Sequence, residues 1–467
     1  MFRFARHYVS WRVLLLMLGD ALLVGTAAYA SHWLEFLGVS GPALWVGSQP
    51  RLPKALGLAI VGVFILFLSD LYALGRWKRG GELAVRLGLA FGMITLVAGA
   101  ASFLMPLFRF GRFNFSLAII LSALGTYAWR VQAMRLLGAE RFRERLLIVG
   151  TGKPAHLVLD ELAAHPGAEF DVVGVVRGNG HEPSAVRENN VPVLGSVADL
   201  EATCAEHRVD SVVVALGERR ASFPLREILA SKMRGVRVED YPNFLERLTG
   251  KIPVNDLRPS WLIFSDGFSQ GTLYRRLKRP LDVVLAALLL ALAAPILLAV
   301  WVAIRLESRG PALFRQERLG RHGRAFVLLK FRSMALDAER ATGPVWAGAD
   351  DPRVTRVGRV IRMARLDELP QLWNVLRGEM SFIGPRPERP HFIQELQEVV
   401  PYYAQRLCVP PGLTGWAQVR YPYGASVEDA LEKLQYDLYY IKNMSLFLDL
   451  MILLGTVQVV LFGRGAR

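Results

Sequence analysis

Residues 281–306, LDVVLAALLLALAAPILLAVWVAIRL, form the longest apolar stretch of the chain and are long enough to enter a bilayer. Lys and Arg residues flank this stretch on both sides, so the positive-inside rule gives it no direction. Pro295 lies near its centre, where a proline removes a backbone donor and kinks a helix. A helix that breaks there and leaves by the face it entered keeps both basic clusters among the head groups. We therefore predict a re-entrant membrane helix over residues 279–306 rather than a straight span.

Four further apolar stretches lie within the first 140 residues, each near the ~20 residues that a spanning helix needs. They are Val13–Ala30, Ala55–Tyr72, Leu87–Met105 and Phe115–Trp129. Basic residues concentrate before the first stretch, between the second and third, and after the fourth, which places both ends of the bundle in the cytoplasm. Buried helices of a soluble protein are the alternative. Asp20 and Asp70 lie within or beside these stretches, where an acid is either functional or hydrogen-bonded between helices. Residues 1–140 are thus predicted to form a four-span transmembrane bundle.

The composition and net charge limit the classes of ligand that the chain is expected to bind. Of 467 residues 52% are hydrophobic, which excludes a disordered protein, and two cysteines exclude a disulfide scaffold. With 56 Lys and Arg against 41 Asp and Glu, the net charge is +15, so anions such as phosphates, anionic lipids or nucleic acid are the expected ligands. Nucleic acid is disfavoured because the basic residues flank a membrane segment and form no recognition motif.

The middle of the chain, residues 141–240, has the pattern of a Rossmann-like α/β module. An apolar strand at Arg145–Gly150 runs into a G-x-G-x-x-A turn, and further strands are expected at Asp171–Val176 and Ser211–Leu216. NAD binding needs an acid at the end of the second strand, but Arg177 stands there. A structural or ligand-sensing module is therefore favoured. Residues 241–270, with mixed polarity and several prolines, are interpreted as a linker.

An adjacent pair of carboxylates, Asp367 and Glu368, marks the C-terminal domain, residues 271–467. Pro370 suits the first turn of a helix and Gly378 its end, so Asp367 is expected at or near the N-cap. Capping alone would explain that aspartate. The other interpretation is a phosphate site, because adjacent carboxylates can hold a divalent cation and supply a nucleophile. Basic residues that recur nearby favour it; they include Lys330, Arg332, Arg362 and Arg386.

From Tyr274 onward the sequence resembles the bacterial sugar transferase domain of the polyprenyl-phosphate glycosyl-1-phosphate transferases. Nearly 200 residues match in the order of that family. The matching motifs are KRPLD (278–282), GPALFRQERLGRHGRAFVLLKFRSM (310–334), DPRVTRVGRVIR (351–362), LDELPQLWNVLRGEMSFIGPRP (366–387) and PGLTGWAQV (411–419). The four spans and the Rossmann-like module resemble the large members of the family, which act in exopolysaccharide, capsule and O-antigen assembly.

The resemblance implies a reaction at the cytoplasmic face of the bacterial cytoplasmic membrane. A sugar-1-phosphate would pass from a UDP-sugar to undecaprenyl phosphate, releasing UMP and leaving a diphosphate-linked lipid. Asp367 would be the nucleophile that forms a covalent phosphosugar intermediate, and Glu368 would help Asp367 to hold Mg²⁺. The catalytic domain would be mainly α-helical and monotopic, anchored by the re-entrant helix. A homodimer is expected from the architecture alone.

Individual site residues follow from the same resemblance. Arg362 matches a phosphate-contacting arginine, while Lys330 of the KFRSM motif and Arg386 of GPRP match polar site residues. Lys278 and Arg279 match the basic start of the re-entrant helix, and Pro295 matches its breaking proline. Two departures stand out: Ala294 replaces a serine common before that proline, and residues 420–424 replace an x-Gly-Arg sequence. The second departure leaves the donor sugar open.

Two other functions account for parts of the pattern. One is a membrane-bound NAD-dependent nucleotide-sugar dehydratase or epimerase, disfavoured by Arg177 and by the lack of a clear Tyr-x-x-x-Lys pair in the middle module. The other is a non-catalytic scaffold for polysaccharide assembly, disfavoured by the intact Asp367-Glu368 pair.

Overall fold

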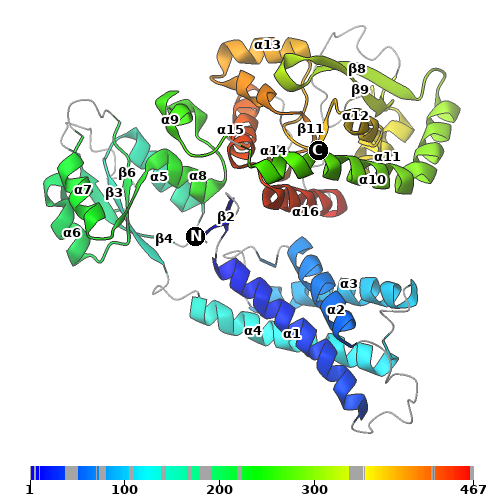
Figure 1. Cartoon of the computed structure of the whole chain (residues 1–467), viewed down its shortest axis with the longest axis horizontal. Coiled ribbons are helices and arrows are strands. Elements are labelled where there is room, and N and C mark those ends of the chain that lie inside the picture. Colours follow the sequence, from blue (N-terminus) through cyan, green and yellow to red (C-terminus); the bar gives the residue numbers. More distant parts are fainter. Residues whose placement is uncertain are drawn as a thin grey trace. The chain divides into compact units, whose positions relative to one another are not determined.

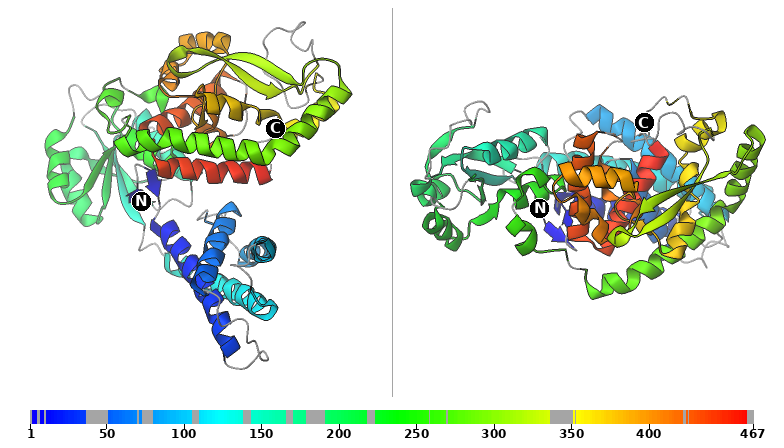
Figure 2. Two further views of the ribbon diagram at one scale, coloured as in Figure 1. Left: turned by 45° about the vertical axis from the view of Figure 1, so that its right-hand side comes forward. Right: turned by 90° about the horizontal axis from the view of Figure 1, so that it is seen from above.

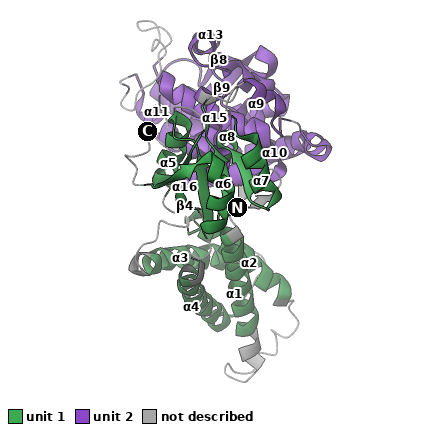
Figure 3. Cartoon of the chain, turned by 90° about the vertical axis from the view of Figure 1, so that its left-hand side faces the viewer, with its two compact units in different colours: residues 1–2, 8–244 green, residues 3–7, 245–467 purple. Residues whose placement is uncertain are grey.

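The computed structural model divides into two compact units, residues 1–2 with 8–244 and residues 3–7 with 245–467 (Figure 3). The structure describes residues 2–4, 7–9, 11–36, 51–69, 71–72, 80–104, 110–137, 143–165, 170–178, 191–217, 223–257, 259–268, 270–335, 351, 353–421, 424 and 426–462. Asp70, one of the two membrane acids considered above, lies outside these residues. Two short strands, β1 (Phe2–Phe4) and β2 (His7–Val9), pair near the start of the chain.

Unit 1 begins with four helices that pack into a bundle. They are α1 (Trp11–Phe36), α2 (Arg51–Leu68), α3 (Gly80–Leu104) and α4 (Arg112–Leu137). Among the described residues, α1 and α3 hold runs long and apolar enough to cross a membrane, at Arg12–Ser31 and Leu83–Phe103. The apolar run of α2, Leu52–Leu68, is shorter, and α4 does not reach that hydropathy. Two of the four predicted spans therefore have the length and composition of a span.

Side chains on the outside of this bundle are also apolar, since Leu18, Ile60 and Leu96 are each more than half exposed. A helix that is apolar on all sides suits a lipid environment. Inside, the buried Asp20 carboxylate pairs with Arg130 at 2.6 Å and accepts a hydrogen bond from Tyr72 at 2.8 Å. Of the two interpretations of Asp20, the structure therefore shows the hydrogen bond between helices.

The second part of unit 1 is a five-stranded parallel sheet of order β5-β4-β3-β6-β7. Its elements are β3 (Glu144–Val149), α5 (Lys153–Ala164), β4 (Phe170–Arg177), β5 (Val193–Ser196), α6 (Leu200–Glu206), β6 (Ser211–Val214), α7 (Leu225–Met233) and β7 (Arg237–Asp240). Counted within the module, this order is 3-2-1-4-5, the first five strands of the six-stranded Rossmann order, so the predicted Rossmann-like module is confirmed. Gly150 follows β3 with φ +120°, and a Cβ there would collide with the Ala215 carbonyl.

Unit 2 is mainly helical, as predicted, with two small two-stranded sheets (Figure 1). The antiparallel pair is β8 (Leu313–Leu319) with β9 (Ala325–Phe331), and the parallel pair is β10 (Ser381–Ile383) with β11 (Gly412–Thr414). Its helices are α9 (Pro259–Phe264), α10 (Thr272–Glu307), α11 (Arg356–Met363), α12 (Gln371–Arg377), α13 (Pro390–Val399), α14 (Trp416–Arg420), α15 (Val427–Asn443) and α16 (Leu446–Phe462); α8 (Tyr241–Thr249) precedes them.

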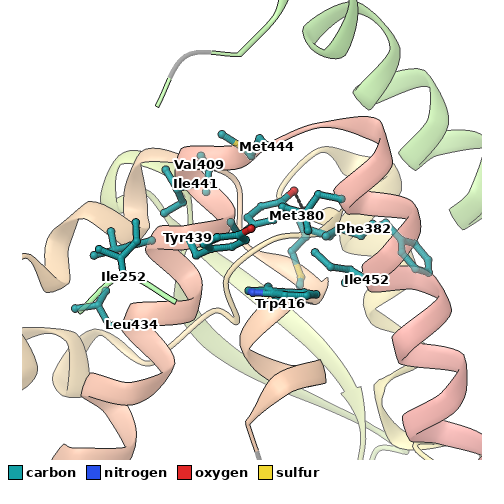
Figure 4. Packing of buried hydrophobic residues seen from close by; sticks show 14 of the residues in the cluster. Ile252, Met380, Phe382, Val409, Trp416, Leu434, Tyr439, Ile441, Met444 and Ile452 are labelled. Carbon is teal, nitrogen blue, oxygen red and sulfur yellow. Dashed lines mark hydrogen bonds between the residues drawn. The ribbon is translucent and has the colours of Figure 1, made fainter. Parts of the chain in front are cut away.

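The main core of unit 2 surrounds the stacked rings of Trp416 and Tyr439, whose centroids are 6.0 Å apart (Figure 4). Ile252 and Val254 are buried in the same core. These two residues belong to the segment 241–270, for which the mixed polarity and the prolines predict a linker. The segment instead contains α8 and α9, and its buried residues make it part of a folded unit. Prolines at helix and turn boundaries gave it the composition of a linker.

Helix α10 contains the apolar stretch of residues 281–306 within one helix of 36 residues that includes Pro295. Its ribbon changes direction part-way along in every view (Figures 1 and 2). Most of its large apolar side chains are exposed: Leu273, Leu277, Leu281, Val284, Leu288, Leu292, Ile296, Leu298, Trp301, Val302 and Leu306. By length and composition alone α10 could also cross a membrane. The helix thus has an uncovered apolar surface on one side of a folded unit.

Candidate active site

The two carboxylates predicted as catalytic lie in a single 3₁₀ turn, Leu366–Glu368, between α11 and α12. Asp367 is 9% exposed. The residue before the turn, Arg365, has a left-handed backbone with φ 57°, which is costly for a side chain other than glycine. Helix α12 has Pro370 at its N-cap position, without a side-chain capping bond. The expectation that Asp367 caps this helix is therefore wrong, because the extra turn separates Asp367 from the helix start.

Glu368 is held by two cations that come from distant parts of the sequence. Lys330 on β9 places its Nζ 3.1 Å from Oε1, and an Arg386 guanidinium nitrogen lies 2.5 Å from the same oxygen. The second Arg386 nitrogen lies 3.5 Å from Oε2. The structure therefore brings together Lys330, Glu368 and Arg386 as predicted from the motifs.

The electrostatics differ sharply between the neighbouring carboxylates. Burial raises the pKa of Asp367, and the Glu368 charge raises it further, against the opposing effect of Lys330, Arg386 and Arg362. Burial acts on Glu368 too, but Arg386 and Lys330 outweigh it and hold the pKa of Glu368 well below its usual range. Burial also lowers the pKa of Lys330, although Glu368 opposes this. Glu368 is thus a fixed anion, whereas Asp367 is the carboxylate with the higher proton affinity.

Asn374 joins α12 to β9, the strand that carries Lys330. Its fully buried side-chain amide donates to the Val327 carbonyl at 2.7 Å and accepts from the Leu329 N–H at 3.1 Å. The same amide donates to Glu379 at 2.6 Å. No sequence motif singles out Asn374, because its partners are mainly backbone groups of β9. A polar residue on the apolar face of a short helix was the available signal.

A buried ion pair supports Arg386, the second of the two cations that bind Glu368. Arg406 donates to Asp437 at 2.9 Å and to the backbone carbonyl of Arg386 at 3.0 Å. Burial raises the pKa of Asp437 to about 6 despite this partner. A small pocket beside Arg386 is lined by residues 385–388 and by Gly320, Arg406 and Val409 among others. Arg406 therefore fixes the loop that carries Arg386, and the small pocket lies next to this loop.

The remaining predicted residues have different surroundings. The Arg362 side chain on α11 has no hydrogen-bonding partner among the described residues, and its charge lowers the pKa of Asp367. Arg332 instead donates to Ser308 and Arg309 carbonyls at 3.0 Å, at the C-terminal end of α10. Lys278 pairs with Asp282 and with Asp449 on α16, at 3.2 and 2.9 Å.

Arg279 donates to the carbonyls of Val375 and Leu376, in the last turn of α12, at 2.6 and 2.8 Å. The structure thus places three of the predicted substrate-binding residues in contacts with other parts of the protein and not beside Asp367 and Glu368. They are Lys278, Arg279 and Arg332.

The carboxylate pair fits a divalent cation only in part. Asp367 has no hydrogen-bonding partner among the described residues, so its oxygens are free to bind one. Glu368 already accepts from two cations. Across the described part of the chain, no group of three or more His, Cys, Asp or Glu side chains is placed to hold a metal ion. Magnesium often binds through one or two carboxylates and substrate phosphates, which is the arrangement this site offers.

Comparison with known proteins agrees with the motifs. The family described as bacterial sugar transferase matches residues 273–463, and a CoA-binding domain family matches residues 68–222. A UDP-glucose:undecaprenyl-phosphate glucose-1-phosphate transferase of Xanthomonas campestris pv. campestris is 30% identical over 461 residues, 93% of this chain and 92% of that protein. The chain belongs to the bacterial sugar transferase family. Its match to that relative covers 93% of the chain and therefore extends beyond the C-terminal domain into the N-terminal helices and the Rossmann-like module.

Other relatives of this bacterial sugar transferase share shorter regions. A UDP-N-acetylgalactosamine-undecaprenyl-phosphate N-acetylgalactosaminephosphotransferase of Aeromonas hydrophila is 40% identical over 261 residues, 56% of this chain. An undecaprenyl-phosphate glucose phosphotransferase of Komagataeibacter xylinus is 34% identical over 357 residues, 73% of this chain. The chain spans 61% and 63% of the length of these two relatives. Because the relatives are named for different sugars, similarity does not select one donor.

Proposed function

We propose that this protein transfers a sugar-1-phosphate from a UDP-sugar to undecaprenyl phosphate and so initiates a lipid-linked glycan. One observation carries the proposal: a buried aspartate without a hydrogen-bonding partner among the described residues lies beside a glutamate fixed by two cations. A free carboxylate amid positive charge is suited to attack phosphorus, since phosphoryl transfer depends on positioning and charge neutralisation. The names of the relatives describe this class of reaction.

The proposed reaction has two displacements at one phosphorus atom. A carboxylate oxygen of Asp367 attacks the sugar-linked phosphorus of the donor, and the bond to the bridging oxygen breaks with its electron pair, releasing UMP. A phosphate oxygen of undecaprenyl phosphate then attacks the same phosphorus, which frees Asp367 and leaves a diphosphate-linked lipid. Arg386, Lys330 and Arg362 neutralise the phosphate oxygens. Mg²⁺, held by Asp367 and Glu368 with donor phosphates, would add charge neutralisation.

A re-entrant α10 on the cytoplasmic face would bring the lipid acceptor to this site. The support is that both ends of α10 bind the same short region: Arg279 contacts α12 and Glu307 contacts α11. At ~1.5 Å per residue a straight helix of this length would separate its ends by more than the ~30 Å hydrocarbon core. A straight span would then place α11 and α12 on opposite faces, although only the catalytic turn separates them. The bilayer, the four-span bundle and a homodimer belong to the same proposal.

The test is to incubate detergent-purified protein with undecaprenyl phosphate, Mg²⁺ and a panel of UDP-sugars. We expect one or more donors to give UMP and an organic-soluble sugar product, and chelation with EDTA to stop both. The Asp367→Asn variant should lose at least ~10³-fold in turnover with an unchanged melting temperature. Wild-type protein that is folded yet releases no UMP across the panel would contradict the proposal, as would an Asp367→Asn variant with full activity.

A further inference from the structure

Helix α10 divides its packing between two hydrophobic clusters, one on each side of Pro295. In the N-terminal arm, Ala286 is buried in the main core with Leu372 and Val375 of α12. In the C-terminal arm, Val300 and Ile304 join a separate cluster. Its other members include Ile361 of α11, and Leu366 of the catalytic turn packs against it. Each arm of α10 therefore packs on a different one of the two helices that flank the turn carrying Asp367.

Hydrogen bonds at the two ends of α10 reinforce this division. Arg279 donates to two carbonyls in the last turn of α12, at 2.6 and 2.8 Å. Glu307 accepts from the first N–H groups of α11, those of Arg356 at 2.8 Å and Val357 at 3.2 Å. A cation at a helix C-terminus and an anion at an N-terminus are both favourable to the helix dipole. Helix α10 is thus hydrogen-bonded to the last turn of α12 and to the first turn of α11.

We propose that Arg279 and Glu307 are positioning residues that couple the bend of α10 to the geometry of the Asp367 turn. Helices α11 and α12 have only eight and seven residues, and the turn between them contains the left-handed Arg365. A change in the angle between the arms moves α11 relative to α12, and with it Arg362 relative to Asp367. In the re-entrant arrangement proposed above, the exposed apolar side chains of both arms lie in lipid, so we expect the angle between the arms to change with acyl-chain length. The inference rests on the proposed function and adds a lipid dependence to it.

The experiment uses the full chain in nanodiscs of short, medium and long acyl-chain lipids. Arg279→Gln and Glu307→Ala remove the hydrogen bonds at the two ends of α10. Arg279→Lys keeps the positive charge with fewer hydrogen-bond donors. Arg275→Gln and Glu317→Gln are the controls, because both residues are exposed and remove the same charges nearby. Two quantities are measured: steady-state UMP release, and amide hydrogen exchange of residues 364–370, which does not depend on activity.

We expect Arg279→Gln and Glu307→Ala each to lower kcat by about tenfold and to leave the donor KM within about twofold of the wild type. The reason is that the turn carrying Asp367 is displaced while the donor site remains. Arg279→Lys should recover part of the loss. Amide hydrogen exchange over residues 364–370 should vary with lipid length in the wild type. In Arg279→Gln and Glu307→Ala it should be faster and independent of lipid length. The two controls should match the wild type.

Exchange in Arg279→Gln and Glu307→Ala that matches the wild type in every lipid would overturn the inference. A raised donor KM with unchanged kcat in Arg279→Gln would also overturn it, since Arg279 would then bind substrate directly. A wild type that shows lipid-dependent exchange but no turnover would contradict the proposed function and support the coupling. If Arg279→Gln does not fold, Arg279→Lys and Glu307→Ala carry the same comparison.

Discussion

Asp367 and Glu368 are neighbours in one turn, yet their carboxylates have opposite surroundings. Glu368 accepts from Arg386 at 2.5 Å and from Lys330 at 3.1 Å, whereas Asp367 is buried without a hydrogen-bonding partner among the described residues. Two acids whose surroundings separate their pKa values are suited to different roles. Glu368 binds the two cations, which leaves the Asp367 carboxylate available for the nucleophilic role that we propose for it.

The pH dependence of turnover should reveal this division. Burial and the Glu368 charge raise the pKa of Asp367, so the acidic limb of kcat/KM should lie above the ordinary pKa of an aspartate. Glu368→Gln removes the neighbouring negative charge and frees Lys330 and Arg386, which lowers the pKa of Asp367. The acidic limb of the residual activity should therefore move to lower pH. A limb that stays in place or moves upward would contradict this assignment.

Asn374 should matter for stability and catalysis together. Asn374→Ala leaves the Leu329 N–H and the Val327 carbonyl without their side-chain partner, at a cost of about 1–2 kcal/mol in the free energy of unfolding, because both bonds are only partly buried. It also loosens α12 from the strand that holds Lys330, so kcat should fall. Thermal denaturation and turnover measure the two effects. Arg377→Gln, exposed on the same helix, should change neither; equal effects of the two substitutions would refute the role given to Asn374.

Arg332 and Arg362 provide a matched pair, because sequence motifs place both near phosphate. Arg332→Gln removes hydrogen bonds to Ser308 and Arg309, so it should lower the melting temperature by several degrees and leave donor KM unchanged. Arg362→Gln should leave the melting temperature unchanged and reduce kcat/KM by about tenfold or more. The reverse pattern would return Arg332 to the substrate site.

The native cysteines test the topology. Cys408 is exposed and Cys204 is buried, so a membrane-impermeant maleimide should modify Cys408 alone. With a re-entrant α10, labelling should occur in inverted membrane vesicles and not in intact spheroplasts. Cys408→Ser provides the control for the labelled site. Labelling in spheroplasts would mean that α10 crosses the bilayer.

The grouping of three charged site residues could be predicted from the sequence, but most of the contacts that hold them in place could not. Motifs predicted Lys330, Glu368 and Arg386 together, and the Rossmann-like strands followed from apolar runs and a glycine turn. Asn374, Arg279 and Arg332 act on backbone N–H and carbonyl groups, which every residue carries, so no pairing pattern marks them. The 3₁₀ turn before α12 was also missed, because Pro370 suits either a first helical turn or the position before it.

The covalent role of Asp367 is tested most directly by trapping. The protein is mixed with a donor labelled in its sugar-linked phosphate, without any lipid acceptor, and protein-bound label is measured after denaturation. We expect up to one label per chain, which is lost on adding undecaprenyl phosphate as labelled lipid forms and is absent in Asp367→Asn. Lipid product formed by a wild type that never carries label, or label retained in Asp367→Asn, would contradict the covalent role of Asp367.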